Sequence, residues 1–191
     1  MAKTNDEFKR EIRRLLEAGF KESFMSGAHG SQWQIADTSS DDASRLNEFF
    51  VLTISSQLFR VFLLLHFSVT PKLETLVSEH LKAGTSTTLD PAKLYDYLGE
   101  LGNAICGAMK RELAHTVPSL GMSTPNRLNK DCMRYIQSLD ISTETHMRAE
   151  HDGDLMFCAS VYLVADDELN YHVKAHSSGT DAVDFGELEL F

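Results

Sequence analysis

Apolar residues recur at intervals of three and four in three parts of the chain, the spacing that places side chains on one face of an α-helix. The first stretch begins at a capping box formed by Thr4–Glu7 and is expected to end at Gly27. The others begin at Thr70-Pro71 and Asp90-Pro91, where a capping side chain precedes a proline at the first helical position. The third pattern continues to about Ala114, so it predicts the longest helix of the chain.

Six shorter segments are rich in β-branched and aromatic residues, a composition typical of β-strands. They lie at 33–35, 48–54, 58–67, 142–150, 155–164 and 169–175. The third is almost continuously apolar, so we expect both of its faces to be covered. Asp152-Gly153 predicts a hairpin turn between the fourth and fifth segments, and 38–42 reads as a polar loop. Together these elements predict an α/β (α+β) single domain with a mostly antiparallel sheet covered by helices.

Length and charge limit the classes of protein to consider. The 191 residues suit one domain, predicted over 1–176, followed by an acidic C-terminal tail over 177–191. The formal net charge of −10 opposes binding to nucleic-acid phosphates and to anionic membrane surfaces. Apolar runs are far shorter than the roughly 20 residues of a membrane span. Three cysteines without a C-x-x-C pair indicate reduced thiols, so we expect a cytoplasmic protein that binds neither nucleic acid nor membrane.

The third predicted helix carries two stripes when its residues are placed about 100° apart. The core-facing stripe contains Leu94, Leu98, Leu101, Ile105, Ala108 and Met109, and the opposite, solvent-facing stripe contains Asp96, Glu100, Asn103 and Gly107. A solvated polar face is the ordinary explanation of the second stripe. However, the glycines at 99, 102 and 107 each cost a helix roughly 1 kcal/mol against alanine, which indicates close approach of a packing neighbour or a partner. Glu100 and Asn103 lie three residues apart and can reach the same bound object.

The residues around this stripe form a more specific pattern. Asp96-x3-Glu100-x2-Asn103, within the segment LGELGNAICG at 98–107, resembles the signature of the CheC/CheX/FliY family of chemotaxis phosphatases. The signature ends in a proline, and the 21 residues between Asn103 and Pro125 make that gap one residue shorter here. The first helix offers glutamates but no asparagine three residues later, so the layout is more similar to CheX than to CheC.

This resemblance implies a function and a role for each residue. The substrate would be the aspartyl phosphate of a CheY-like response-regulator receiver domain, in chemotaxis or related two-component signalling. Glu100 would pair with a lysine of the receiver, Asn103 would hold water in line with phosphorus, and Asp96 and Gly107 would support or contact the partner. Positioning the attacking water molecule is the main contribution that a protein makes to phosphoryl transfer. The receiver would supply Mg²⁺, so the chain needs no cofactor of its own, and similarity to CheX implies a homodimer.

Other chemistry finds less support in the sequence. The eight histidines form no recognised zinc-ligand spacing, so we expect no metal, and Cys106 is expected to be a buried, inert thiol. Two other functions stay open: a non-catalytic adaptor that binds a receiver domain or a flagellar component, and a sensory module that binds a ligand between sheet and helices. The presence of both Glu100 and Asn103 favours the phosphatase over the adaptor.

Overall fold

One β-sheet organises the fold, and the computed structural model describes it over residues 6–25, 32–81, 89–117, 119–136 and 138–165. The helices are α1 (Asp6–Met25), α2 (Ser40–Ser44), α3 (Pro71–His80), α4 (Pro91–Ala114) and α5 (Met133–Ile136), with the 3₁₀-helix η2 (Lys130–Cys132) before α5. The strands are β1 (Trp33–Asp37), β2 (Glu48–Ser55), β3 (Phe59–Phe67), β4 (Gly121–Met122), β5 (Asn126–Asn129), β6 (Thr143–His151) and β7 (Asp154–Ala165). They pair antiparallel in the order β1-β6-β7-β3-β2-β4, with β5 also on β2, so the predicted α+β fold is confirmed.

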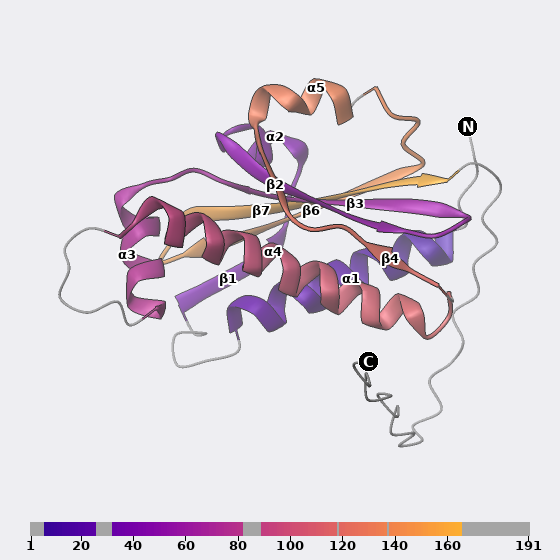
Figure 1. The fold of residues 1–191 in the computed structure, drawn as a ribbon, viewed down its shortest axis with the longest axis horizontal. Helices are drawn as coiled ribbons and strands as arrows, with labels where there is room; N and C mark the ends of the chain where they lie inside the picture. Colours follow the sequence, from indigo (N-terminus) through magenta and orange to yellow (C-terminus); the bar gives the residue numbers. More distant parts are fainter. Residues whose placement is uncertain (1–5, 26–31, 82–88, 118, 137, 166–191) are drawn as a thin grey trace, which may run out of the picture.

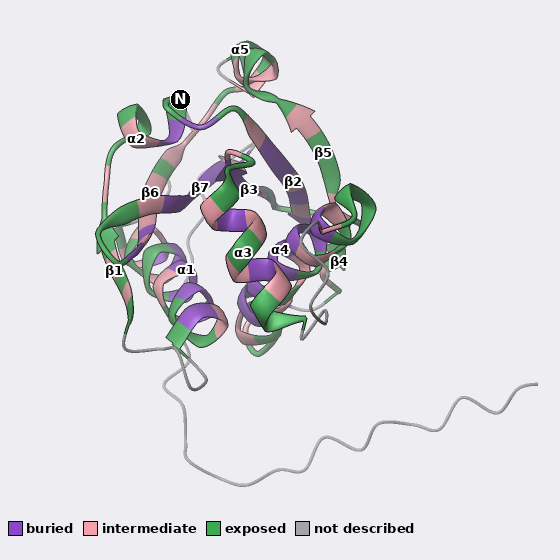
Figure 2. Cartoon of the chain, turned by 90° about the vertical axis from the view of Figure 1, so that its left-hand side faces the viewer, coloured by how far each residue is buried: buried purple, intermediate pink, exposed green. Residues whose placement is uncertain are grey.

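The elements form layers on either side of this sheet. Helices α1 and α4 lie side by side on one face, whereas α2 and α5 lie on the other (Figure 1). The inner sides of α1 and α4 are buried and their outer sides are exposed (Figure 2). No helix in the described ranges is long and apolar enough to cross a membrane.

Strand β3 is buried on both faces, as its apolar sequence predicts. Leu63 and Leu65 point into the main core, which also contains the apolar stripes of α1 and α4. Leu64 points the other way, where it packs with Phe49 and Tyr162 under α5. Alternate residues of one strand therefore serve two separate cores.

Both predicted hairpins form. Asp152 and Gly153 have positive φ angles of 51° and 79°, the backbone that an Asp-Gly turn supplies most easily. At the β2–β3 turn, the Ser56 hydroxyl accepts hydrogen bonds from the backbone N–H groups of Leu58 and Phe59, at 3.0 and 3.1 Å. The side chain therefore closes a turn that contains no glycine.

The interpretation of 38–42 as a loop is wrong, because α2 begins at Ser40. The Ser39 side chain caps this helix by accepting a hydrogen bond from the Asp41 N–H at 3.3 Å. Asp42 then accepts bonds from Thr38 and, at 3.2 Å, from Arg148 of β6. A five-residue helix has too few turns for apolar periodicity to reveal it.

The short elements that follow α4, from β4 to α5, are not predicted by any local pattern in the sequence. Strands β4 and β5 pair with β2 at one edge of the sheet, and η2 and α5 then cross to the face away from α4. Several other expectations concern residues outside the described ranges: the cap at Thr4 and Asn5, the helix end at Gly27, the strand at 169–175 and the acidic tail at 177–191. The proposed domain boundary at 176 therefore stays a prediction.

Candidate functional site

The orientation of α4 follows from its first turn and its apolar stripe. The Asp90 carboxylate accepts a hydrogen bond from the Ala92 N–H at 3.0 Å, and Pro91 opens the helix as predicted. The entire expected core stripe is buried, from Leu94 to Met109. With that side against β2 and β3, the opposite stripe has to face outward.

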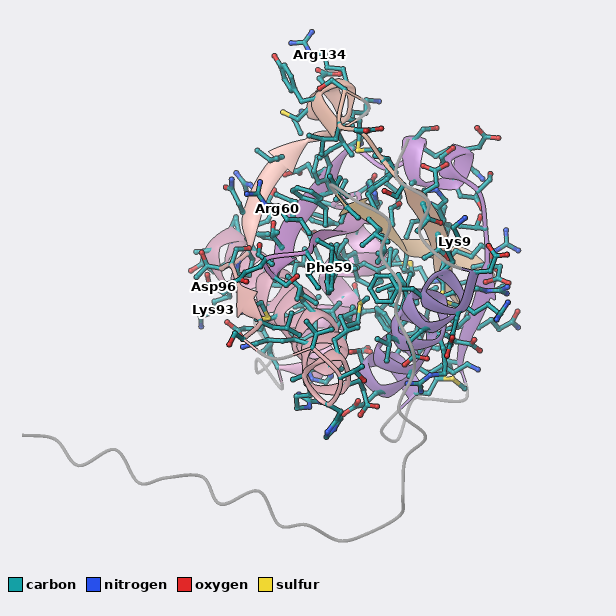
Figure 3. All side chains as sticks on the ribbon, turned by 90° about the vertical axis from the view of Figure 1, so that its right-hand side faces the viewer. Lys9, Phe59, Arg60, Lys93, Asp96 and Arg134 are labelled. Atoms are coloured by element: carbon teal, nitrogen blue, oxygen red, sulfur yellow. The ribbon has the colours of Figure 1, made fainter. Side chains whose placement is uncertain are left out.

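We call Asp96, Glu100, Asn103 and Gly107 the motif face. Asp96 and Glu100 are exposed, and Asp96 lies at the periphery of the molecule (Figure 3). The Asn103 amide Nδ2 donates a hydrogen bond to Glu100 Oε1 at 3.4 Å, so the structure brings these two predicted residues together. Within the described ranges no hydrogen bond or ion pair joins Asp96 to either of them.

Asn103 is more buried than a solvent-facing position predicts. Its side chain is half-buried, and its Oδ1 atom is inaccessible to water and accepts no hydrogen bond. A buried acceptor without a partner costs about 1–3 kcal/mol. Turning this amide outward would therefore break only the long bond to Glu100 and would free the oxygen to accept a new partner.

Two of the three glycines in α4 lie where the helix meets the sheet. A Cβ atom added at Gly102 would lie 3.0 Å from Leu52 Cδ1, so β2 approaches the helix backbone closely. One added at Gly99 would lie 3.8 Å from both the Phe50 ring and Pro125 Cβ. The predicted close approach is confirmed at Gly102, whereas at Gly99 the neighbours lie at ordinary van der Waals distance. The shorter gap in the sequence still brings Pro125 against the motif helix.

Gly107 is different. A Cβ atom added there would meet only Arg111 Nη1, at 3.9 Å, so no packing neighbour within the described ranges explains this glycine. Gly19 of α1, in contrast to Gly107, is tightly packed. A Cβ atom added there would lie 3.2 Å from the backbone oxygen of Ile105 in α4. The α1–α4 contact favours glycine at position 19, whereas position 107 has room for a Cβ atom.

We therefore expect opposite effects from the same substitution in these two helices. Gly19→Ala should lower the free energy of unfolding by about 1–2 kcal/mol, because a packed backbone oxygen cannot move aside easily. Gly107→Ala should raise it by about 0.5–1 kcal/mol through helix propensity alone. Urea denaturation of both variants checks the pair. Destabilisation by Gly107→Ala would show that position 107 is packed.

A cluster that the sequence did not reveal forms around Tyr95, one residue before Asp96 in α4. The Arg127 guanidinium lies 3.9 Å from the centre of the Tyr95 ring, and its Nε lies 3.6 Å from a Glu48 carboxylate oxygen. The Tyr95 hydroxyl donates to the other oxygen of Glu48 at 3.3 Å, and partial burial together with that carboxylate raises the pKa of Tyr95. A cation is thereby held over the ring of Tyr95, the residue that precedes Asp96 in the helix. The spacing of α4 could not indicate Arg127, which comes from β5.

The described part of the chain gives little support for a reactive cysteine, a metal site or a second copy of the motif. Burial raises the pKa of the Cys106 thiol to about 12, so this cysteine is unreactive at neutral pH, as predicted. No group of three or more His, Cys, Asp or Glu side chains in these ranges could hold a metal ion. Glu11 and Glu17 of α1 form ion pairs with Arg14 and Lys21 at 2.7 and 2.6 Å, and no asparagine follows either glutamate three residues later.

Comparison with known proteins gives matches in structure alone. No protein-family model matches the sequence, and curated proteins give no significant match. CheX from Vibrio vulnificus has a TM-score of 0.59 at 14% identity, covering 81% of this chain and 99% of that one. A CheC-like superfamily protein from Shewanella sp. PV-4 has a TM-score of 0.52 at 11% identity, covering 85% and 100%. A chain of the CheX–CheY–BeF3–Mg²⁺ complex from Borrelia burgdorferi has a TM-score of 0.55 at 9% identity, covering 81% of this chain and 96% of that one.

These likenesses define the architecture. Two long helices cover one face of an antiparallel sheet, and this fold is similar to that of a solved chemotaxis protein. More particularly, the chain has the CheC/CheX-like fold, as its sequence predicts. Nearly the whole of the matched CheX chain is covered, so no major part of that fold is missing here.

Proposed function

We propose that this chain hydrolyses the aspartyl phosphate of a CheY-like receiver domain. The observation that carries the proposal is the joint presentation of Glu100 and Asn103 on the outer side of α4, with the Asn103 acceptor unused. Two further features support it: the CheC/CheX-like fold, and the fact that one CheX neighbour has been solved with CheY, BeF3 and Mg²⁺.

The proposed mechanism relies on positioning. Glu100 forms a charge-assisted contact with a lysine of the receiver, and Asn103 enters the receiver's site. Its amide then orients a water molecule, whose oxygen attacks phosphorus as the bond to the aspartyl oxygen breaks. A neutral amide suits this role, because a carboxylate there would repel the phosphoryl oxygens. The receiver would supply Mg²⁺, and this chain would supply no cofactor.

The direct test is phosphate release from phosphorylated CheY-like receiver domains, measured with and without this chain. We expect a catalytic acceleration that scales with the amount of chain added. Binding of a BeF3-loaded receiver without any acceleration would refute the phosphatase and leave the non-catalytic adaptor. A homodimer and a cytoplasmic location also remain predictions, which sedimentation and cell fractionation would check.

Glu100 should affect docking more than Asn103 does. Glu100→Gln is expected to weaken binding to a BeF3-loaded receiver about tenfold, because it removes one charge-assisted contact. Glu79→Gln is the matched control: it removes the same charge from an exposed position on α3. Calorimetric titration measures both affinities. Equal weakening by the two variants would mean that net charge, and not the motif face, controls binding.

A further inference from the structure

An arginine continues the motif face toward the C-terminal end of α4. Asn103, Gly107 and Arg111 are spaced by four residues, so they form one row along the helix. Arg111 Nη1 lies 3.9 Å from the position that a Cβ atom would take at Gly107, so the Arg111 side chain runs back toward Asn103. Gly107 itself lies roughly 6 Å along the axis from Asn103. Because glycine has no side chain, no other side chain of this row separates the guanidinium from Asn103.

Arg111 is held only weakly by its own chain. Its side chain is 67% exposed, and it pairs with the equally exposed Glu22 of α1 at 3.8 Å. An exposed ion pair of this kind contributes at most about 1 kcal/mol. The contact between α1 and α4 depends instead on their buried apolar residues. The guanidinium of Arg111 can therefore turn to a new partner at small cost.

The charge of the motif face gives this arginine a purpose. Asp96 and Glu100 are both acidic, and the whole chain has a net charge of −10, so this face by itself repels anions. The proposed substrate is an anion, because it carries a phosphoryl group. A cation close to Asn103 would offset the repulsion at the place where that group has to dock.

Helix α4 contains three cations, and they are not equivalent. Lys93 lies at the periphery beside Asp96 (Figure 3), about 15 Å along the helix from Asn103. Long side chains of a helix lean toward its N-terminus, which carries Lys93 away from Asn103 and Arg111 toward it. Lys110 is half-buried. Arg111 is therefore the exposed cation of this helix that is best placed to meet a group docked against Asn103.

We propose that Arg111 makes this chain select the phosphorylated form of its receiver, by donating hydrogen bonds from its guanidinium to the phosphoryl group. The inference rests on the proposed function and adds a specificity-determining residue to it. A guanidinium carries paired N–H donors that match the oxygens of a phosphoryl group. Glu100 would contact a lysine that both forms of the receiver possess, whereas Arg111 would contact a group that only one form carries. Removal of Arg111 should therefore change selectivity and not general docking.

Titration calorimetry with one CheY-like receiver, with and without BeF3 and Mg²⁺, tests the role of Arg111. BeF3 stands in for the phosphoryl group. We expect the wild-type chain to bind the loaded receiver more tightly than the unloaded one. Arg111→Gln should lower this ratio of affinities about tenfold, by loss of one charge-assisted contact, and should leave binding of the unloaded receiver within about twofold. Arg111→Lys keeps the charge without the paired donors, so its ratio should lie between those of wild type and Arg111→Gln.

Lys93→Gln is the matched control, because it removes the same charge from another exposed position of α4. It should leave the ratio within about twofold of wild type, since the charge lies more than a Debye length from Asn103. An equal loss of the ratio in Lys93→Gln and Arg111→Gln would overturn the proposal, and so would a wild-type chain that binds both forms equally.

The outcome also separates this inference from the proposed phosphatase. If the wild-type chain accelerates phosphate release and Arg111→Gln keeps the wild-type ratio, the role of Arg111 is wrong and the phosphatase stands. If the ratio depends on Arg111 but phosphate release is not accelerated, the phosphatase is wrong and Arg111 still selects the loaded receiver. Absence of binding to either form would overturn both.

Discussion

Asn103→Ala is expected to lower the rate of phosphate release from a phosphorylated receiver by about 100-fold or more, the size of effect that loss of reactant positioning produces. The same variant should bind a BeF3-loaded receiver with an affinity within about twofold of wild type, because Glu100 remains to make the charged contact. An effect on turnover without an effect on binding is what distinguishes a water-positioning residue from a docking residue.

The contacts of Asn103 indicate that its substitution will change turnover without disturbing the fold. Its Oδ1 makes no hydrogen bond and its Nδ2 makes one long bond to Glu100, so alanine removes little that stabilises the free protein. We expect the melting temperature to change by no more than about 2 °C, since removal of the unsatisfied acceptor offsets the loss of the side chain's packing and of its long bond. A large fall would mean that the side chain is mainly structural.

Asn47→Ala is the matched control for this experiment. It removes another asparagine side chain, from an exposed position before β2 and outside the motif face. We expect it to retain wild-type turnover and binding. If Asn103→Ala also retains wild-type turnover on a receiver that the native chain dephosphorylates, the assigned role of Asn103 is wrong.

The elements predicted correctly are those whose signals are local. Helix α4 begins at a cap followed by proline and repeats its apolar positions over 24 residues, and the β6–β7 hairpin turns on Asp152-Gly153. Each of these signals lies within a few residues, so tertiary contacts are not needed to interpret it. The elements that were missed, α2, β4, β5 and α5, have two to five residues each and form because the sheet is already there.

The candidate site also has features that local sequence predicts and features that depend on tertiary packing. The joint exposure of Asp96 and Glu100 follows from helical spacing, which the sequence contains directly. The burial of Asn103 Oδ1 and the position of Arg127 depend on how residues after α4 return to β2. Helical spacing places Gly107 on the outer stripe, but only the packing shows that β2 approaches the helix closely at Gly102.

The second prediction with a large expected effect concerns the buried histidines and the way the free energy of unfolding depends on pH. His66 is buried beside the Phe49 ring at 5.3 Å, the Ser160 hydroxyl and the neighbouring His146, and none of these is a carboxylate that would pair with a charged imidazole. Burial first, and then His146, lower its pKa from 6.5 to about 4, and burial also lowers the pKa of His146. In the folded protein near pH 5, His66 is therefore neutral, whereas in the unfolded chain it carries a proton.

The direction of the effect follows from proton binding. Between about pH 6.5 and pH 4 the unfolded chain binds the proton on His66 and the folded chain does not, so acidification favours unfolding. A shift of this size corresponds to a loss on the order of 3 kcal/mol across that range. Below about pH 4 the folded protein binds the proton too, and the contribution of His66 to the slope disappears.

Urea denaturation in steps from pH 7 to pH 4 measures this slope. We expect His66→Gln, which keeps a polar group near Ser160, to flatten the dependence clearly, leaving the contributions of His146 and the carboxylates. His80→Gln removes an exposed histidine on α3, leaves the buried histidines in place, and is the control variant for this experiment. Parallel slopes for wild type and His66→Gln would contradict the prediction, since they would mean that His66 is protonated in the folded protein at the same pH as in the unfolded chain.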